Sequence, residues 1–440
     1  RKGYGQLRRA DDTVVSQHTV PEEAYERASA EPPGVYTWYP ARIEIEVPAA
    51  PAPVPAPVPA PAPAPVPAPV PAPAPSPAPA PAPAGRLLQK SDLRYMGAFK
   101  VPVGIGDDTF EWGGTALGLG PSGRSLYLTG HDHQQRSAEI SIPEVRTSGY
   151  ATASLLQSWR DATEGKLGQF APGTSDGVKI GGHLVYGGKL YVTGWAYYDS
   201  GDQQRASIIE RPLSLSDTGK IVGPVAVPGV RQRFMAGYMC PIPAAWQGAL
   251  GGPVLAGLPN PPIIGNGSGG PTAIVFDPAN LSKSAIPLLA FPHPSDLATL
   301  YGYAANSGTN PVWNWLSLPR GCVFPDGTDS VLFIGSHGAG EMYYGGGERD
   351  PANPYYGSHA YPYVFQVWAY DANDLAKVRR GEAQMDKIKP YSYWTFELPN
   401  DPGRTDVKCG GAAFDPQTRR IYVSALRCDG DAPLIHVFEV

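Results

Sequence analysis

Aromatic side chains are concentrated in two long segments, residues 295–316 and 336–363, where amides, carboxylates and histidines accompany them. Aromatic faces beside hydrogen-bonding groups suit sugar rings, which present patches of C–H bonds edged with hydroxyl groups. Long loops on a rigid scaffold are the usual place for binding groups, so we predict a ligand-binding set here. Its members are Tyr301, Tyr303, Trp313, Trp315, Tyr343, Tyr344, Tyr355 and Tyr356. The alternative is that these rings pack on one another to fill Gly-rich loops.

Three carboxylates, Glu111, Asp176 and Asp406, each stand shortly before a Gly-rich apolar segment. If those segments converge, the three acids are the candidate catalytic groups of a glycoside hydrolase, which needs two carboxyl groups roughly 5 to 10 Å apart. The acids stand at different distances from their Gly pairs, however, and the Gly-rich segments contain no Asp or Glu. No nucleophile elbow, P-loop or dinucleotide fingerprint is present, and no cofactor is expected. We favour binding without catalysis, with hydrolysis as the alternative.

His131, Asp132 and His133 are of residue types that bind metal ions. Two histidines that flank an aspartate in a loop more often hydrogen-bond the loop itself, so we predict no metal site and keep these three as weak candidates. The triplet Gln134–Arg136 recurs as Gln203–Arg205 before the third strand of the next repeat. Repetition at equivalent positions favours a structural tie over a functional site.

Self-comparison identifies the scaffold that positions these groups. Five segments share one pattern: small residues leading into an apolar run, a turn, and an apolar strand that ends in a small residue. They are 113–130, 181–194, 237–257, 321–335 and 410–425. Each is followed by a third strand, and a fourth strand that ends in or near proline follows at 224–230, 286–291 and 393–398.

The last repeat stops after its third strand, whereas a strand of the fourth type, Tyr95 to Val101, precedes the first repeat. This is the ring-closing pattern of a β-propeller, which hides both sheet edges. We therefore predict an all-β, five-bladed β-propeller over residues 86–440, with the N-terminal strand closing the last blade and the Gly-rich strand innermost. In this topology the two long aromatic segments, His131–His133 and Trp195–Asp199 share one face, where we expect a partner to bind.

A tract from Pro48 to Ala84 carries proline at nearly every second position. Proline has no N–H and fixes φ, so the tract favours an extended polyproline II rod at roughly 3.1 Å per residue. We predict three parts: a small module over 1–47, a rigid linker over 48–85, and the propeller over 86–440.

The N-terminal module is predicted to be α+β. Residues 1–12 look like a basic arm, and 14–19 like a strand. Thr19 can cap a helix that Pro33-Gly34 ends, and alternation at 35–38 and 42–47 predicts two more strands.

The composition of the chain excludes several classes of protein. A net charge of −5 with no Lys/Arg run argues against a nucleic-acid partner. No apolar run approaches the roughly 18 residues of a membrane span. Four cysteines are too few for a disulfide scaffold. Cys409 and Cys428 either form a disulfide or remain two thiols. Cys240 and Cys322 are interpreted as small buried thiols, and His183 is interpreted as an interior histidine.

The sequence "VVSQHTVPEEAYERASAEPPGVYTWYPARIEIEV" resembles a small module that recurs in virion proteins of tailed bacteriophages. The segments "YMGAFKVP" and "GGTALGLGPSGRSLYLTGH" are similar to uncharacterised propeller proteins of phages and environmental bacteria, which implies no known activity. The resemblance implies a virion appendage, fibre or decoration protein that is located on the virion or outside the cell. Residues 1–47 would join other virion subunits in a larger assembly, and the propeller would contact a host-surface glycan or protein. The alternatives are a secreted or surface-tethered glycoside hydrolase and a purely structural propeller.

Overall fold

The computed structural model divides into two compact units, residues 1–76 and 77–440. It describes the backbone of 5–9, 14–18, 34–39 and 43–47 in the first unit. In the second unit it describes 85–174, 177–197, 199, 201–259, 271–290, 300–302, 310–343, 350, 359–403 and 406–440.

The first unit contains a four-stranded antiparallel sheet in the order β2-β1-β3-β4. Its strands are β1 (Gly5–Arg9), β2 (Val14–His18), β3 (Gly34–Tyr39) and β4 (Ile43–Val47). Three of these strands are as predicted. The predicted basic arm is wrong over residues 5–9, because this stretch pairs with β2 on one side and β3 on the other. The helix predicted after Thr19 lies outside the described residues.

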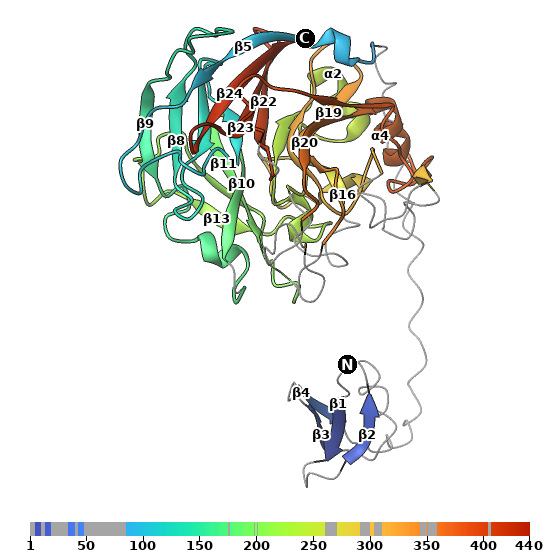
Figure 1. The fold of residues 1–440 in the computed structure, drawn as a ribbon. Coiled ribbons are helices and arrows are strands. Elements are labelled where there is room, and N and C mark those ends of the chain that lie inside the picture. The colour runs from blue at the N-terminus through green and yellow to red at the C-terminus, as the bar shows by residue number, and fades with distance from the viewer. Residues whose placement is uncertain are drawn as a thin grey trace, which may run out of the picture. The chain divides into compact units, whose positions relative to one another are not determined.

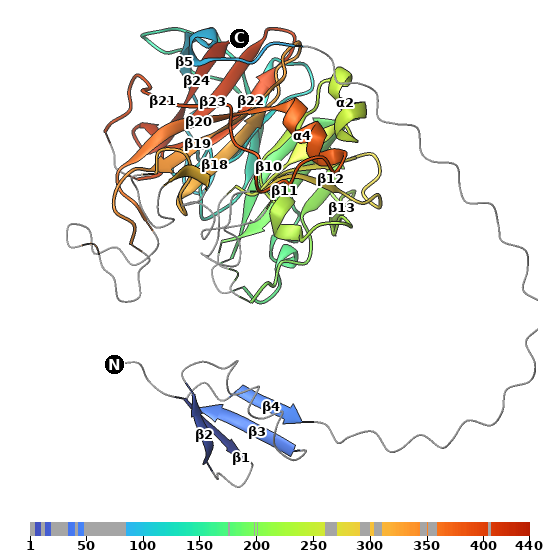
Figure 2. The same cartoon turned by 90° about the vertical axis from the view of Figure 1, so that its right-hand side faces the viewer.

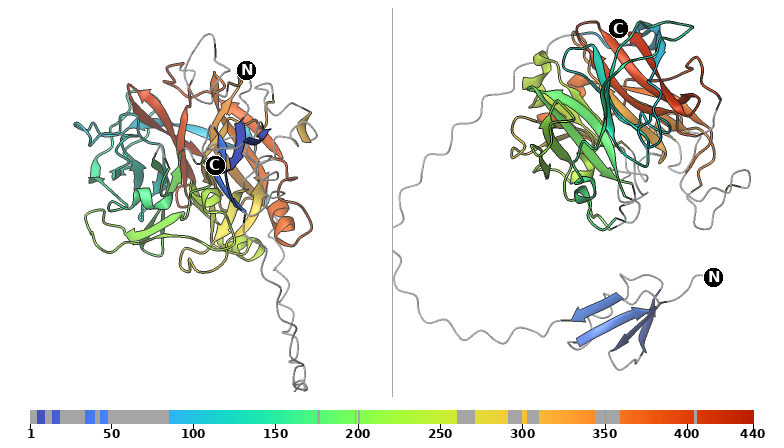
Figure 3. Two further views of the ribbon diagram at one scale, coloured as in Figure 1. Left: turned by 90° about the horizontal axis from the view of Figure 1, so that it is seen from below. Right: turned by 90° about the vertical axis from the view of Figure 1, so that its left-hand side faces the viewer.

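The second unit is a five-bladed β-propeller, as predicted, and each blade is a four-stranded antiparallel sheet (Figures 1 and 3). Blade 1 comprises β6 (Leu117–Leu119), β7 (Ser125–Thr129), β8 (Ser137–Ser141) and β9 (Leu155–Arg160). Blade 2 comprises β10 (Val178–Tyr186), β11 (Lys189–Ala196), β12 (Ile208–Pro212) and β13 (Val222–Val225). Blade 3 comprises β14 (Met239–Pro241), β15 (Val254–Ala256), β16 (Pro271–Phe276) and β17 (Ile286–Ala290). Blade 4 comprises β18 (Ser317–Val323), β19 (Ser330–Gly338), β20 (Tyr363–Asp371) and β21 (Ser392–Phe396).

Blade 5 closes the ring as predicted. It comprises β22 (Cys409–Asp415), β23 (Arg420–Asp429), β24 (Ala432–Glu439) and the N-terminal strand β5 (Arg94–Lys100). Strand β5 pairs antiparallel with β24, with Ala98 opposite His436. The chain therefore supplies the outermost strand of its last blade from the start of the propeller.

Apolar cores lie between every neighbouring pair of blades. The innermost strands approach one another so closely that side chains do not fit at several glycines. A Cβ atom on Gly181 would lie 2.0 Å from the carbonyl oxygen of Ala236, and one on Gly410 would lie 2.0 Å from that of Gly114. This crowding explains why the repeat is marked by glycine and alanine.

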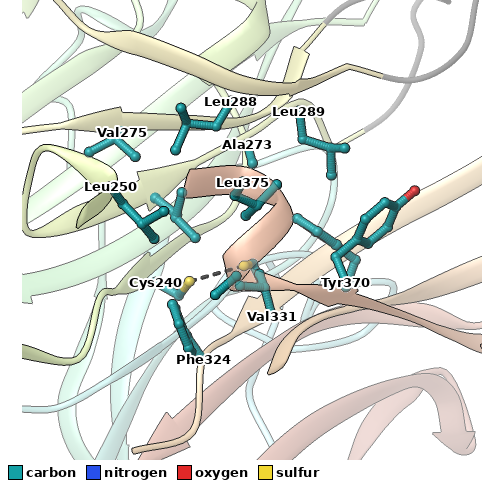
Figure 4. Packing of buried hydrophobic residues seen from close by; sticks show 14 of the residues in the cluster. Cys240, Leu250, Ala273, Val275, Leu288, Leu289, Phe324, Val331, Tyr370 and Leu375 are labelled. Carbon is teal, nitrogen blue, oxygen red and sulfur yellow. Dashed lines mark hydrogen bonds between the residues drawn. The ribbon is translucent and has the colours of Figure 1, made fainter. Parts of the chain in front are cut away.

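Two short helices, α2 (Ala244–Leu250) and α4 (Ala372–Arg379), decorate blades 3 and 4. They pack against each other and against the core between these blades (Figures 2 and 4). Three 3₁₀ turns are also present: η1 (Lys90–Asp92), η2 (Leu167–Phe170) and η3 (Gln232–Met235). No described helix combines the length and the apolar character that a membrane span requires.

The outer strands depart from the predicted pattern in two places. Strand β9 has no proline at its end and was not predicted. Strand β13 spans Val222–Val225, so the predicted strand 224–230 is wrong over residues 226–230. No disulfide joins any of the four cysteines, all of which are described residues. A Cys409–Cys428 disulfide does not form, because the register of β22 and β23 places Cys409 opposite Ala425.

Candidate functional site

A pocket of about 480 Å³ opens at the ends of the inner strands where the long loops enter, and all five blades contribute to it. We call it the axial pocket. Its aromatic lining residues are Trp112, Trp195, Tyr197, His359, Tyr361 and Tyr363. Its charged lining residues are Asp132, Lys179, Arg320, Asp406 and Arg427, and Thr115, His133, Ile180, Pro259, Val407 and Leu426 complete the wall. The pocket therefore combines ring faces with hydrogen-bonding groups.

One ion pair in the wall joins blades 1 and 2. The Lys179 ammonium group donates to both the Oδ2 atom and the backbone carbonyl of Asp132, at 2.8 Å each. Gln135 holds this turn in place: its amide nitrogen donates to the Asp132 carbonyl at 2.5 Å, and its oxygen accepts from the backbone N–H of Ile180 at 2.6 Å. Gln204 makes a similar tie to the backbone of Ala196, Gly194 and Ala206. The repeated Gln-Gln-Arg triplets are thus structural, through their second glutamine.

The second ion pair joins Arg427 to Asp406 within blade 5. The Arg427 guanidinium also lies over the ring of Trp112, with its carbon 4.8 Å from the ring centroid. A cation over an indole face stabilises both groups and fixes the ring, although Trp112 keeps 46% of its surface exposed. Trp112 therefore presents an ordered aromatic surface at the pocket.

Arg320 differs from the other two cations. It lies in the middle of the inner strand β18, and no hydrogen bond or ion pair to its guanidinium occurs among the described residues; its Nε atom is buried without a partner. Burial lowers the pKa of Arg320 from its usual value, although the charge of Asp132 acts in the opposite direction. Arg320 therefore has no direct counter-ion among the described residues, although Asp132 acts on it through its charge.

The aromatic wall is built largely from the end of the 336–363 segment. His359 stacks between Tyr343 and Tyr361, with centroid distances of 5.6 and 4.6 Å. Tyr361 meets Tyr363 edge-on at 5.8 Å, and on the blade 2 side Trp195 and Tyr197 lie 6.0 Å apart. Tyr197 is 46% exposed, so its ring is open to a ligand.

Of the two predicted acids that the structure describes, one lines the axial pocket. Asp406 lines the axial pocket, whereas Glu111 is exposed in a turn and is not part of the pocket wall; Asp176 lies outside the described residues. The carboxylate that accompanies Asp406 in the pocket is Asp132, one of the weak metal candidates. Asp132 and Asp406 are each held by a cationic side chain.

The predicted aromatic residues that the structure describes do not form one binding surface. Trp313 is 2% exposed, stacks on Trp368 at 4.3 Å and donates to the Tyr370 hydroxyl, so it belongs to the core and not to a binding surface. Tyr301 packs against the same core, and Trp315 is partly buried. Tyr343 reaches the pocket only through its stacking on His359. The other four, Tyr303, Tyr344, Tyr355 and Tyr356, lie outside the described residues.

The metal candidates form no ligand cluster. His131 accepts from the backbone N–H of His133 at 3.2 Å, and Asp132 is paired with Lys179. Within the described ranges, no group of three or more His, Cys, Asp or Glu side chains is placed to hold a metal ion.

A second cavity, of about 470 Å³, lies at the other end of the inner strands and is mainly apolar. His183 lines it and is 1% exposed, with Nε2 at 2.8 Å from the Ser137 hydroxyl. Burial lowers the pKa of His183 to about 3, so the ring is neutral at physiological pH. His183 is therefore an interior histidine, as predicted.

The prediction missed Trp112, Lys179, Arg320 and Arg427 in the axial pocket. The strand sequence SLPRGCV contained one usable signal, because an arginine amid buried residues of an inner strand must point into the channel. The other three are ordinary loop or strand-end residues, and only the closed ring brings them together.

Comparisons with known proteins show no matching family model and no matching curated relative. Among solved structures, the native arabinanase Arb43A of Bacillus subtilis matches with 10% identity and a TM-score of 0.40, over 78% of this chain and 96% of that chain. An endo-arabinanase of Bacillus licheniformis matches with 10% identity and a TM-score of 0.38, over 77% and 95%. A luciferin-regenerating enzyme matches with 10% identity and a TM-score of 0.30, over 81% and 96%. At these values, none of them carries an inference about activity.

Proposed function

We propose that the propeller binds carbohydrate in the axial pocket and does not turn it over. The observation that carries this proposal is the composition of the pocket, in which exposed rings such as Trp112 and Tyr197 stand beside charged groups from separate blades. Ring faces suit the C–H patches of sugars, and fixed polar groups suit their hydroxyls.

Glycoside hydrolysis is the second candidate, favoured by the presence of two carboxylates, Asp132 and Asp406, in one pocket. Hydrolysis requires one carboxyl group to donate a proton. Each of these carboxylates instead accepts from a cationic side chain, Lys179 or Arg427. This arrangement supports binding more than catalysis.

We also propose that the protein is a virion appendage that displays the propeller to a host surface. The support is the resemblance of residues 14–47 to a phage virion module and the Pro-Ala tract that follows. Residues 1–47 would then attach to other virion subunits.

A glycan array and a reducing-end assay on the full chain test the main proposal. Binding without new reducing ends supports it. If the chain releases new reducing ends and Asp132→Asn or Asp406→Asn abolishes this release, the protein is a glycoside hydrolase instead. If no glycan binds, both carbohydrate binding and hydrolysis are rejected. Detection of the chain by mass spectrometry in purified phage particles tests the virion proposal separately.

A further inference from the structure

Arg320 carries the first inference. On the same strand, β18, the side chains of Leu318 and Cys322 are buried. Arg320 instead lines the axial pocket, together with Tyr363 and Trp195. Arg320 keeps part of its surface exposed, but its Nε atom is buried, and removing the polar atoms of a cation from water is costly unless a partner compensates them. Neither carboxylate of the pocket forms an ion pair with Arg320: Asp132 pairs with Lys179 and acts on Arg320 through its charge alone, and Asp406 pairs with Arg427.

We propose that Arg320 binds the carboxylate group of an acidic saccharide in the axial pocket. A guanidinium presents two parallel N–H groups that match a planar carboxylate. The aromatic rings around it take the sugar face, and this part of the proposal rests on the proposed carbohydrate binding. Asp132 and Asp406 repel additional negative charge, which disfavours doubly charged phosphate groups.

Acidic oligosaccharides and their methyl esters test this on the full chain, because the esters keep the sugar and remove the charge. Oligogalacturonate, oligoglucuronate and a sialylated glycan are titrated calorimetrically, each beside its ester. We expect at least tenfold tighter binding of one acid than of its ester. Arg320→Met should abolish this preference and Arg320→Lys should keep part of it. Arg380→Met, at an exposed arginine paired with Glu382, is the matched control and should change nothing.

Equal affinity for acids and esters would overturn the inference and leave carbohydrate binding standing. If no saccharide binds, acetate and benzoate are titrated against tryptophan fluorescence. If these carboxylates quench the fluorescence of the parent protein but not that of Arg320→Met, the carboxylate site is supported and the proposed carbohydrate binding is rejected. The absence of a carboxylate effect would overturn the inference.

Cys240 and Cys322 carry a second, independent inference. They lie on the inner strands β14 and β18 of neighbouring blades, and their Sγ atoms are 3.0 Å apart. Figure 4 marks this contact at Cys240 with a dashed line. Both residues line the second, mainly apolar cavity, at the opposite end of the inner strands from the axial pocket. They are 4% and 1% exposed.

We propose that these two thiols form a disulfide that links blade 3 to blade 4 under oxidising conditions. The two thiols together lose two protons and two electrons as the S–S bond forms. A small-molecule disulfide accepts these protons and electrons and is reduced to two thiols. Burial raises the pKa of Cys322, which slows attack in the folded protein, so the bond forms most readily as the chain folds.

The full chain is refolded from urea in a glutathione redox buffer and, separately, incubated folded with oxidised dithiothreitol. Peptide mapping without reduction should show a Cys240–Cys322 link after refolding, and Cys428→Ser should leave it intact. Reduction should lower the melting temperature of the oxidised protein and leave that of Cys240→Ser unchanged. Four free thiols, glutathione adducts alone, or a Cys409–Cys428 link under both conditions would overturn the inference.

Discussion

The hydroxyl group of Tyr95, on the first strand of the propeller, lies 3.0 Å from Nδ1 of His436 on its last strand. The two residues are 341 positions apart, and their contact belongs to the pairing of β5 with β24 that closes the ring. On the next residues of β5, Ala98 and Phe99 are fully buried. Strand β5 therefore both completes the sheet of blade 5 and contributes buried side chains to its core.

We expect Tyr95→Phe to lower the free energy of unfolding by about 1 kcal/mol, because it removes one partly buried hydrogen bond. Phe99→Ala should cost about 3–5 kcal/mol through the cavity it leaves. Tyr393→Phe is the control, since Tyr393 lies on the outermost strand of blade 4 and is 41% exposed. Urea unfolding measures all three, and equal effects of Tyr95→Phe and Tyr393→Phe would contradict the role of the closure contact.

Stability should fall as the pH is lowered from about 6.5 towards 4.5. Burial lowers the pKa of His183 to about 3, and the pKa values of His337 and His436 to about 4. Each histidine binds fewer protons in the folded protein than in the unfolded chain below pH 6.5. Its contribution is therefore complete above pH 6.5 and is lost as the pH falls towards the folded pKa, at up to about 1.4 kcal/mol per pH unit.

Urea unfolding at several pH values measures this slope. His337→Gln should reduce this slope, because it replaces a titratable ring by an amide that binds no proton in this pH range. In the folded protein the ring is bonded through both nitrogens, to Ser317 and to the Asn310 carbonyl. His133→Ala, at an exposed side chain, should leave it unchanged. A stability that stays constant between pH 7 and pH 4.5 would contradict the prediction.

Asp199 and Arg233 form a buried ion pair, with 1% and 2% of their side chains exposed. We expect Asp199→Asn to lower the free energy of unfolding by about 3 kcal/mol, because the buried Arg233 guanidinium loses the carboxylate beside it, while Asp202, 45% exposed and 3.7 Å away, is a weaker partner. Asp374→Asn, which breaks the surface pair with Lys377, should cost less than about 1 kcal/mol. Thermal or urea unfolding distinguishes the two, and similar losses would show that burial does not control the effect.

The propeller could be predicted because its repeat follows from packing at the axis, where Gly181 and Gly410 leave no room for a Cβ atom. The site could be predicted only in part. The 336–363 segment does supply rings to the pocket, but Trp313 lies in an equally aromatic segment and stacks on Trp368 of β20 instead. Loop composition does not say which way a ring points. The Asp132–Lys179 pair depends on where blades 1 and 2 meet, which no local pattern encodes.

The exposed rings of the axial pocket should control carbohydrate affinity. Trp112 and Tyr197 are each 46% exposed and line the pocket on different blades. A ring stacked on a sugar is worth about 1 kcal/mol, so Trp112→Ala and Tyr197→Ala should each weaken binding about fivefold while the chain stays folded. Tyr393→Ala is the matched control, because Tyr393 is 41% exposed but lies on an outer strand away from this pocket. Calorimetric titration with the tightest ligand from the array measures the effect. Losses as large for Tyr393→Ala, or none for either pocket residue, would place the carbohydrate elsewhere on the molecule.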